Sequence, residues 1–322
     1  MTRYFITGGC GFIGSHVAHR LLDKHPGAEV TIFDNLTSGQ ESYIADIRDD
    51  ERLKLVVGDL KNLDAVIEAS QGCDHAYHFA ANPDIAKAVT EPSVDFWEGT
   101  YLANNLVEAC RMNGVHRITY ASGSGVYGDL GDTPVTEDYG PLNPVSTYGA
   151  SKLGCEALMS AYCHMFEMHV AAFRFANVVG PRQTHGVTYD FVRRLLDDPS
   201  ELRILGDGQQ SKSYIHVDDV IDALFLLEER AWQGFELYNV GTQDYVTVKE
   251  IADLVVDQLG LENVEYKFTG GSRGWKGDVP VVRFNTERIR ALGWANRFTS
   301  KEALADSIAS NISEAGKEAA TR

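Results

Sequence analysis

The chain has 322 residues, enough for one large domain or two modest ones with a real core. With 44% hydrophobic and 23% charged residues, it has the composition of a soluble globular protein rather than a disordered one. Its 46 acidic and 29 basic residues give a formal net charge of −17 without a Lys/Arg-rich stripe, which argues against nucleic acid as a partner.

The cysteines and the apolar segments narrow the class of protein further. The five cysteines are odd in number and include no CxxC pair, so we expect neither a disulfide nor a metal site. No signal peptide precedes the first predicted strand, and no uncharged apolar stretch approaches membrane-spanning length. We therefore expect a cytoplasmic protein without a membrane partner.

The first predicted elements indicate a dinucleotide site. Residues 2–7 are predicted to form a buried strand and residues 16–22 a helix, so the glycines between them lie on a strand-to-helix turn. In such a turn Gly8 permits the sharp bend, Gly11 lets the backbone approach a pyrophosphate, and Gly14 lets helix pack on strand. The helix N-terminus then offers unpaired N–H groups to the phosphates.

The second predicted strand, residues 29–33, identifies the dinucleotide. It ends at Asp34, whose carboxylate is placed to accept hydrogen bonds from an adenosine ribose. The same charge repels a 2′-phosphate. We therefore expect NAD rather than NADP as the cofactor.

Downstream, strands and helices alternate. Apolar strands are predicted at 53–57, 75–79 and 117–121, with helices at 95–113 and 146–165. This alternation predicts an α/β fold of the Rossmann type, a doubly wound parallel sheet covered by helices on both faces. Ligands of such sheets bind at the carboxyl ends of the strands. The residues at those ends are Gly8, Asp34, Asp59, Ala80 and Ser122.

The alternation breaks near Asn177, where Gly-rich loops begin. We predict an NAD-binding domain over 1–176 and a smaller substrate-binding lobe formed mainly by 177–322. The two are partly interleaved, because the apolar segment 235–240 can return to the main sheet. Residues 300–313 predict an amphipathic helix, followed by a frayed end at 314–322.

Tyr148 and Lys152 are the candidate acid–base pair. They are four residues apart in a predicted helix, so both side chains lie on one face. A phenol ordinarily ionises near pH 10, and a neighbouring ammonium together with a positive nicotinamide favours the phenolate. A Tyr-x-x-x-Lys pair is common on helix surfaces, but its position after the fifth strand of a dinucleotide fold favours a general base for a sugar or alcohol hydroxyl.

Eight stretches spread over nearly the whole chain carry a resemblance. They are TGGCGFIG (7–14), DNLTSG (34–39), GDL (58–60), HFAA (78–81), VYGD (126–129), YGASK (148–152), RFANVVGPR (174–182) and SYIHVDD (213–219). With them the chain resembles the extended short-chain dehydrogenases/reductases, and specifically the nucleotide-sugar epimerases of the UDP-galactose (UDP-glucose) 4-epimerase type.

The resemblance implies a mechanism and a cofactor site. NAD stays bound, Tyr148 takes the proton of the sugar 4-hydroxyl while C4 gives up hydride, and both return after the 4-keto sugar has turned over. Lys152 holds the nicotinamide ribose. The implied NAD-binding residues are Gly8, Gly11, Phe12, Ile13, Gly14, Asp34, Asn35, Ser38, Gly39, Asp59, Leu60, Phe79, Ala80, Ala81, Tyr148, Lys152, Phe175 and Val178.

The resemblance also implies a UDP-sugar site and a homodimer formed through the helices at 95–113 and 146–165. Arg273 is the expected diphosphate clamp, because arginine can bind phosphate through two parallel hydrogen bonds. Asp278 is expected at a ribose hydroxyl, and Arg182 either meets a sugar carboxylate or is structural. The implied substrate-binding residues are Ser124, Tyr148, Asn177, Arg182, Tyr189, Lys212, Tyr214, Arg273 and Asp278.

Two positions depart from the family pattern. Gly123 stands where a Ser or Thr usually bridges the sugar oxygen and the tyrosine, so Ser122 or Ser124 is the candidate replacement. Gly99 stands where an Asn is usual. The related dehydratases and decarboxylases carry carboxylates in the turn at Ser124 and Gly125, and none is present here.

We therefore predict an NAD-dependent isomerase that epimerises C4 of a UDP-sugar, with UDP-glucose and UDP-galactose favoured. UDP-glucuronate or a UDP-N-acetylhexosamine is the alternative substrate. A non-catalytic protein that binds NAD or a nucleotide sugar is the alternative of another class, which the two glycine substitutions motivate.

Overall fold

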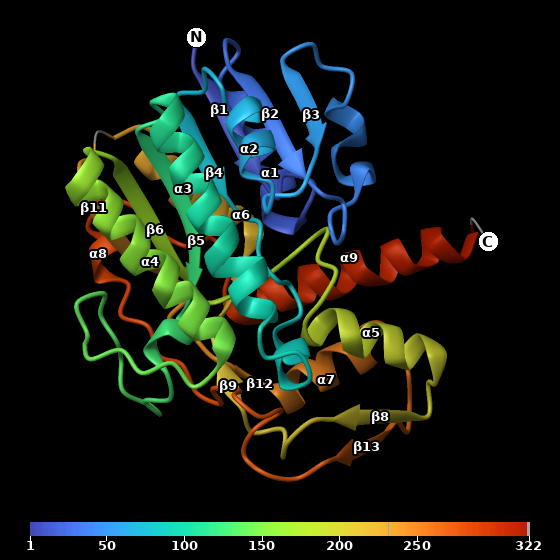
Figure 1. Cartoon of the computed structure of the whole chain (residues 1–322). Coiled ribbons are helices and arrows are strands. Elements are labelled where there is room, and N and C mark those ends of the chain that lie inside the picture. Colours follow the sequence, from blue (N-terminus) through green and yellow to red (C-terminus); the bar gives the residue numbers. More distant parts are fainter. Residues whose placement is uncertain (231, 321–322) are drawn as a thin grey trace. The chain divides into compact units, whose positions relative to one another are not determined.

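The computed structural model describes residues 1–230 and 232–320, which form two compact units. The first unit contains Met1–Val126, Thr147–Arg174 and Ile221–Tyr238. The second contains Tyr127–Ser146, Phe175–Val220 and the chain from Asn239 onward. Each unit is therefore assembled from separated segments, which Figure 1 shows by the change of colour along the chain.

A seven-stranded sheet organises the first unit, in the order β11-β6-β5-β4-β1-β2-β3. Strands β3 to β5 pair in parallel through β2, β1 and β4. Because β1 has β2 on one side and β4 on the other, the direction of winding reverses beside it, which is where such sheets bind ligands. The strands are β1 (Arg3–Thr7), β2 (Glu29–Asp34), β3 (Leu53–Val57), β4 (His75–His78), β5 (Arg117–Gly123), β6 (His169–Phe175) and β11 (Phe235–Val240).

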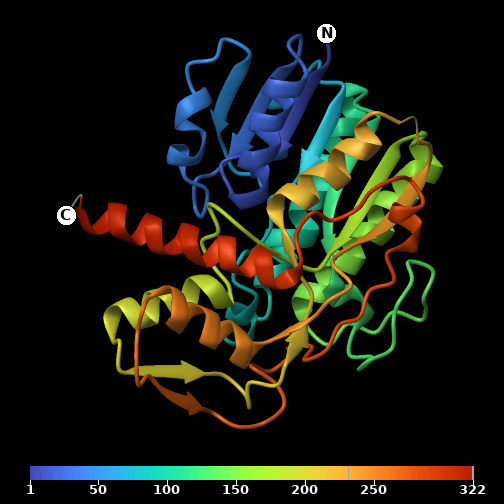
Figure 2. The same cartoon turned by 180° about the vertical axis from the view of Figure 1, so that it is seen from behind.

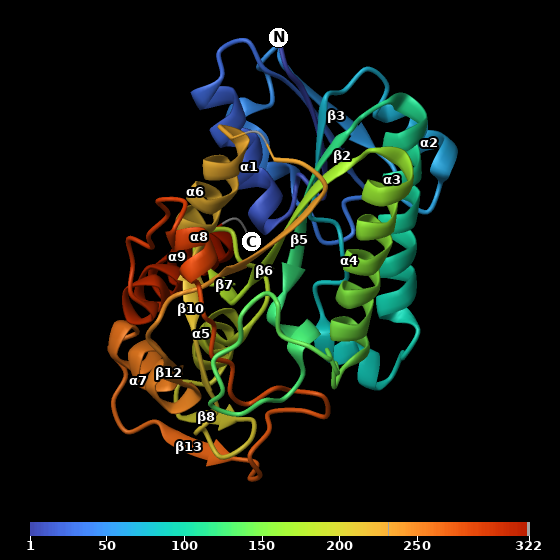
Figure 3. The ribbon, with the colours of Figure 1, turned by 90° about the vertical axis from the view of Figure 1, so that its left-hand side faces the viewer.

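Helices cover both faces of this sheet, as the alternating pattern predicts (Figure 3). One face carries α2 (Leu63–Ala69), α3 (Tyr101–Asn113) and α4 (Thr147–Phe166), and the other carries α1 (Phe12–Lys24) and α6 (Val217–Glu228). Apolar side chains on the α3 and α4 face pack with those of the strands into one core. Its members include Phe5, Phe33, Ile118, Leu106 and Met159.

Four short helical segments lie in the connections. They are the 3₁₀ segments η1 (Glu41–Ile47), η2 (Ile85–Val89) and η4 (Ser124–Tyr127), and the π-helical turn η3 (Phe96–Thr100). The π-turn runs directly into α3, so the helix predicted at 95–113 is interrupted in its first part. π-turns inside helices are rare and are often found at functional sites.

The second unit is built from short strand pairs and helices (Figure 2). Strand β7 (Asn177–Val179) pairs with β10 (Tyr214–His216), β9 (Ser211–Lys212) with β12 (Val246–Thr247), and β8 (Glu201–Ile204) with β13 (Glu265–Phe268). Its helices are α5 (Val187–Asp197), α7 (Val248–Gln258), α8 (Glu287–Arg290) and α9 (Ser300–Ala320). Phe191, Ile251 and Leu304 from α5, α7 and α9 share one apolar core.

The predicted end of the last helix is wrong, and the two units divide the chain differently from the predicted domains. Helix α9 continues to Ala320 instead of ending at 313, because Ala315 extends its buried stripe by another turn. The predicted first domain contains residues 127–146, yet these belong to the second unit, where Val135 bridges Phe284 and the Tyr127 hydroxyl donates to Asn239. The prediction that 235–240 returns to the main sheet is confirmed by β11.

Candidate active site

The glycine turn after β1 is as tight as the sequence pattern requires. Gly8 has φ of +72°, and a Cβ there would lie 2.7 Å from the Ala80 nitrogen. A Cβ on Gly14 would lie 2.2 Å from the Gly8 carbonyl oxygen, so only glycine fits. Gly11 is the N-cap of α1, which begins at Phe12 without a side-chain cap and without an acidic residue in its first turn. Phe12, Ile13 and the glycines thus leave backbone N–H groups and a positive helix end for a pyrophosphate.

Asp34 ends β2 beside this turn with its carboxylate already fixed. Oδ2 accepts from the Cys10 backbone N–H at 2.9 Å, and Oδ1 accepts from the Leu36 N–H at 2.9 Å. Gly39 approaches so closely that a Cβ there would lie 2.8 Å from Oδ1. A carboxylate oxygen has more than one acceptor site, so this anchored group can still accept ribose hydroxyls. Asn35 and Ser38 are exposed in the loop between Asp34 and Gly39.

The loops after β3 and β4 carry further candidate residues at the carboxyl ends of the strands of the first unit. Asp59 accepts from the Lys61 N–H at 2.8 Å, and the Leu60 carbonyl accepts from the Asn105 side chain at 2.9 Å. Asn105 is buried on α3 and fixes this loop, a role that only the tertiary structure reveals. Residues Phe79, Ala80 and Ala81 follow β4 half-buried, with Ala80 against the glycine turn. All these residues lie where a dinucleotide would bind along the sheet edge.

Tyr148 and Lys152 share one face of α4, as the spacing predicts. The Lys152 ammonium donates to the Ala121 carbonyl at 2.7 Å and lies 5.6 Å from the centre of the Tyr148 ring. Lys152 is buried, whereas Tyr148 is half-buried and can be reached from outside. Burial, with the charge of Lys152, lowers the pKa of His78 to about 3. His78 is therefore neutral at physiological pH and adds no second cation beside Lys152.

Gly123 leaves space beside the tyrosine hydroxyl. A Cβ at this position would lie 3.8 Å from Tyr148 Oη and 4.0 Å from its Cε1, which are ordinary contact distances. A serine hydroxyl would therefore fit within hydrogen-bonding reach of Tyr148. At Gly99, by contrast, a Cβ would lie 2.3 Å from Ser151 Oγ, so a larger residue would have to displace that hydroxyl.

Of the two candidate serines, the structure directs Ser122 away from this role. Its hydroxyl donates to Glu156 Oε1 at 2.5 Å, and Glu156 in turn forms a buried ion pair with Arg174 at 2.6 Å. The Ser122 hydroxyl thus helps to satisfy a buried carboxylate, which is the physical reason to correct its assignment as a catalytic group. Ser124, half-buried at the start of η4, is the remaining candidate.

The charged candidates of the second unit are paired with one another. Lys212 Nζ lies 2.7 Å from Asp278 Oδ1, while Asp278 Oδ2 accepts from the Gly274 N–H at 3.0 Å. Arg273 donates to the Asp278 carbonyl at 2.6 Å and to the Asp129 carboxylate. Both Asp278 carboxylate oxygens are therefore engaged, and both candidate cations, Lys212 and Arg273, already have an anionic partner.

The other substrate candidates lie on or near β7, β10 and α5. Asn177 and Val178 are half-buried on β7, where they pair with Tyr214 and Ile215 of β10. Tyr214 is 5% exposed, and burial followed by the charge of Asp278 raises its pKa, so its phenol stays protonated.

The remaining candidates of this unit have different surroundings. Tyr189 on α5 lies 5.1 Å beneath the Arg193 guanidinium, and Phe175 is buried at the end of β6. Arg182 has φ of +68°, and its backbone N–H donates to Glu314 at 3.3 Å.

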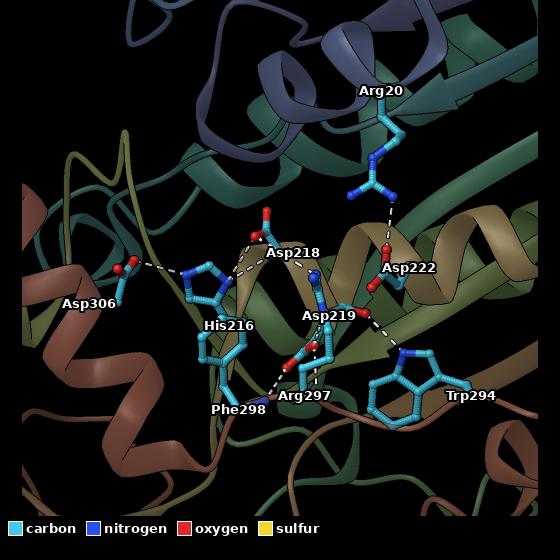
Figure 4. Close-up of polar contacts among 9 residues, drawn as sticks. All are labelled: Arg20, His216, Asp218, Asp219, Asp222, Trp294, Arg297, Phe298 and Asp306. Atoms are coloured by element: carbon cyan, nitrogen blue, oxygen red, sulfur yellow. Dashed lines mark hydrogen bonds and ion pairs between the residues drawn. The ribbon is translucent and has the colours of Figure 1, made fainter. Parts of the chain in front are cut away.

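The SYIHVDD stretch has a structural role in the second unit (Figure 4). Asp219 is fully buried and accepts from the backbone N–H groups of Arg297 at 2.9 Å and Phe298 at 3.2 Å. His216 Nε2 lies 3.0 Å from Asp306 Oδ2, and the His216 ring lies 4.3 Å from the Phe298 ring, centre to centre. These contacts hold the segment before α9 against the start of α6.

Membrane and metal features can be stated for residues 1–230 and 232–320. Within these ranges, no helix is long and apolar enough to span a bilayer. Nor does the described part of the chain contain a cluster of three His, Cys, Asp or Glu side chains suited to hold a metal ion.

Residues 4–241 match the family model of the NAD dependent epimerase/dehydratase family, and the chain belongs to this family. It is 30% identical over 315 residues to a putative UDP-glucose 4-epimerase of Methanocaldococcus jannaschii, covering 93% of this chain and 95% of the relative. A solved UDP-galactose 4-epimerase is 36% identical with a TM-score of 0.84, covering 97% of this chain and 99% of the other.

The relatives also include a dehydratase. A double mutant of the dTDP-glucose 4,6-dehydratase of Streptomyces venezuelae, solved with NAD, is 28% identical with a TM-score of 0.90, covering 98% of both chains. The predicted family, Rossmann-type fold, NAD cofactor and enzyme class are confirmed. The sugar, the nucleotide and the residues that bind them stay predictions.

Proposed function

We propose that this enzyme epimerises C4 of a UDP-sugar through a 4-keto intermediate, with UDP-glucose and UDP-galactose as the favoured pair. The observation that carries the proposal is the placement of Tyr148 and Lys152 on one face of α4 at the end of β5, above a turn without a carboxylate. Named UDP-glucose and UDP-galactose 4-epimerases among the relatives support it.

Each residue of this group has a distinct role in the proposal. Tyr148 takes the proton of the 4-hydroxyl and returns it to the opposite epimer. Lys152, anchored on the Ala121 carbonyl, keeps its ammonium 5.6 Å from the centre of the Tyr148 ring. Bound NAD supplies the hydride acceptor and donor. The space beside Gly123 admits Ser124 or a water molecule as the third hydrogen-bonding group at the sugar oxygen.

The turn after β5 favours epimerisation over dehydration. Elimination of water from C5 and C6 needs a group that protonates the departing hydroxyl. The residues at this turn are Ser124 and Gly125, neither of which is an acid. Epimerisation at C4 needs no such donor, so the chemistry that remains available is proton and hydride transfer at a single carbon.

In the proposal the second unit holds the nucleotide part of the substrate. Arg273 and Lys212 are its cations for the diphosphate, and Asn177 and Tyr189 are its contacts to the sugar. UDP-glucuronate stays the alternative substrate. Arg182 either meets its carboxylate, which a guanidinium binds through two hydrogen bonds, or is structural.

A homodimer through α3 and α4 belongs to the same proposal. Met112 on α3 is 54% exposed and Met165 on α4 is 70% exposed, so each helix presents an apolar side chain to solvent.

The purified enzyme should convert one of UDP-glucose, UDP-galactose and UDP-glucuronate into its C4 epimer without added NAD. The product sugars are separated after hydrolysis, and Tyr148→Phe is assayed beside the wild type. We expect the variant to lose activity by a factor of about 10² or more, because the general base is gone. Full activity of Tyr148→Phe would refute the mechanism, and no turnover of any UDP-sugar by NAD-loaded wild type would favour the binding protein.

A further inference from the structure

A buried carboxylate in the first unit has no role in the mechanism described so far. Asp95 is 2% exposed, immediately before the π-turn Phe96–Thr100. Its Oδ1 accepts from the Asn82 side chain at 2.9 Å, and its Oδ2 accepts from the Thr147 hydroxyl at 2.7 Å. Within the residues that the structure describes, no cation pairs with it. A buried carboxylate held only by neutral donors is costly, so its retention calls for a specific task.

The two partners of Asp95 lie in the two parts of the proposed active site, Asn82 in the cofactor loop after β4 and Thr147 on the helix of the proposed base. Asn82 lies in the loop after β4, whose Ala80 lies against the glycine turn. The Asn82 backbone N–H donates to the Glu98 carbonyl at 3.1 Å. Thr147 is the first residue of α4 and directly precedes Tyr148. The Asp95 side chain therefore links the cofactor loop to the helix that carries the proposed base.

The π-turn holds α4 at a second point one helical turn further on. The Thr100 hydroxyl donates to Ser151 Oγ at 3.0 Å, and Gly99 has no Cβ that would displace this hydroxyl. Thr147 and Ser151 are four residues apart and share a face of α4. Tyr148 and Lys152 are the next residue after each. The contacts of Thr147 and Ser151 thus fix the position and the rotation of α4 beside Tyr148 and Lys152.

We propose that Asp95 is a positioning residue, which sets the proposed base on α4 relative to the cofactor loop through Thr147 and Asn82. The inference rests on the proposed function, since it assigns Asp95 to the placement of Tyr148. Proton transfer needs the phenol within hydrogen-bonding reach of the sugar hydroxyl, and a displacement of about 1 Å can cost about 10² in rate. Asp95 therefore acts on the rate of the chemical step rather than on nucleotide binding.

Thr147→Val tests this at an exposed residue on the first turn of α4. The variant keeps the shape of the side chain but loses the hydrogen bond to Asp95, and Thr147→Ser restores it. Thr90→Val is the matched control, because it removes an exposed hydroxyl of the same unit, which donates to the Lys87 carbonyl at 3.0 Å. We expect Thr147→Val to lower kcat about tenfold or more with KM changed less than about twofold. Thr147→Ser and Thr90→Val should keep kcat within about twofold of the wild type.

A second readout needs no sugar substrate. The ultraviolet absorbance of phenolate is followed against pH in the NAD-loaded enzyme, and the Tyr148 signal is the difference from the matching protein with Tyr148→Phe. In Thr147→Val the pH dependence of this signal should differ from that of the wild type, because Tyr148 then lies differently relative to the cofactor loop. An unchanged kcat together with an unchanged phenolate signal would overturn the proposal. A shifted signal in an enzyme that turns over no UDP-sugar would support the positioning role and refute the proposed function instead.

Discussion

The pairing of Arg273 with Asp129 gives a prediction with a definite sign. If Arg273 binds the substrate diphosphate, the Asp129 carboxylate competes for the same guanidinium and repels the phosphates. Asp129→Asn removes both effects. Arg273 stays in place in the variant, because its other hydrogen bond, to the Asp278 carbonyl at 2.6 Å, does not involve Asp129. We therefore expect Asp129→Asn to bind UDP more tightly than the wild type does.

The expected gain follows from the exposure of the pair. The side chains of Arg273 and Asp129 are 41% and 27% exposed, so water screens their attraction. Partly exposed ion pairs are worth about 0.2–1 kcal/mol, and about 1 kcal/mol corresponds to a fivefold change in affinity. Loss of the ion pair alone should lower the dissociation constant of UDP by about 1.4-fold to fivefold, and loss of the repulsion adds to this change. The gain should shrink as salt is added.

Isothermal titration with UDP measures this without any turnover. Asp132→Asn is the matched control, since it removes one negative charge from the same loop, at a side chain that is 83% exposed and pairs with Arg283. Tighter binding in Asp129→Asn alone would support competition at Arg273. Equal changes in both variants would mean that only the net charge matters. Weaker binding in Asp129→Asn would refute the reasoning, because Asp129 would then position Arg273 for the phosphates.

Gly123→Ser should raise kcat for the true substrate about tenfold, because the new hydroxyl comes within reach of Tyr148, whereas Gly123→Ala should not. Equal rates in the serine and alanine variants would show that the hydroxyl is not used. In Glu228→Gln, the free energy of unfolding should depend less on pH in the acid range than in the wild type. Burial raises the pKa of Glu228, but His75 and two tyrosine hydroxyls outweigh burial and lower the pKa from 4.5 to about 2. A carboxyl with a lowered pKa stabilises the fold above about pH 4.5 and loses that contribution as the pH falls towards 2. Between these pH values the free energy of unfolding of the wild type should therefore fall by about 3 kcal/mol more than that of the variant. Urea unfolding at several pH values measures this, and parallel acid limbs in the two proteins would contradict it.

Much of the first unit could be predicted because its signals are local. The features of the cofactor turn lie close together in sequence: Gly8 at φ of +72°, the start of α1 after Gly11, and the Asp34 carboxylate at the end of the next strand. The structure has each of them where the pattern requires it. The pairing of Tyr148 with Lys152 is equally local, since a helix places residues four apart on one face. The alternation of strands and helices likewise predicts the parallel sheet.

The segments that follow β5, namely the turn with its two serines and residues 127–146, were harder to predict. Ser122 and Ser124 are equivalent in sequence, and only the burial of the Glu156–Arg174 pair shows that the first hydroxyl is directed into the core. Residues 127–146 carry no periodicity, so their assignment to the second unit depends on contacts with residues near 239 and 284.

By itself, then, the sequence determined the fold class, the glycine turn after the first strand and the helix face that carries the candidate acid–base pair. Neighbouring residues decide backbone turns and helical faces. The tertiary structure alone decided which charges meet. Among 46 acidic residues, nothing local marks Asp129 as the partner of Arg273 or Asp95 as the partner of Thr147. Such pairs join segments that are distant in sequence, so packing of the folded chain selects them and a local pattern cannot.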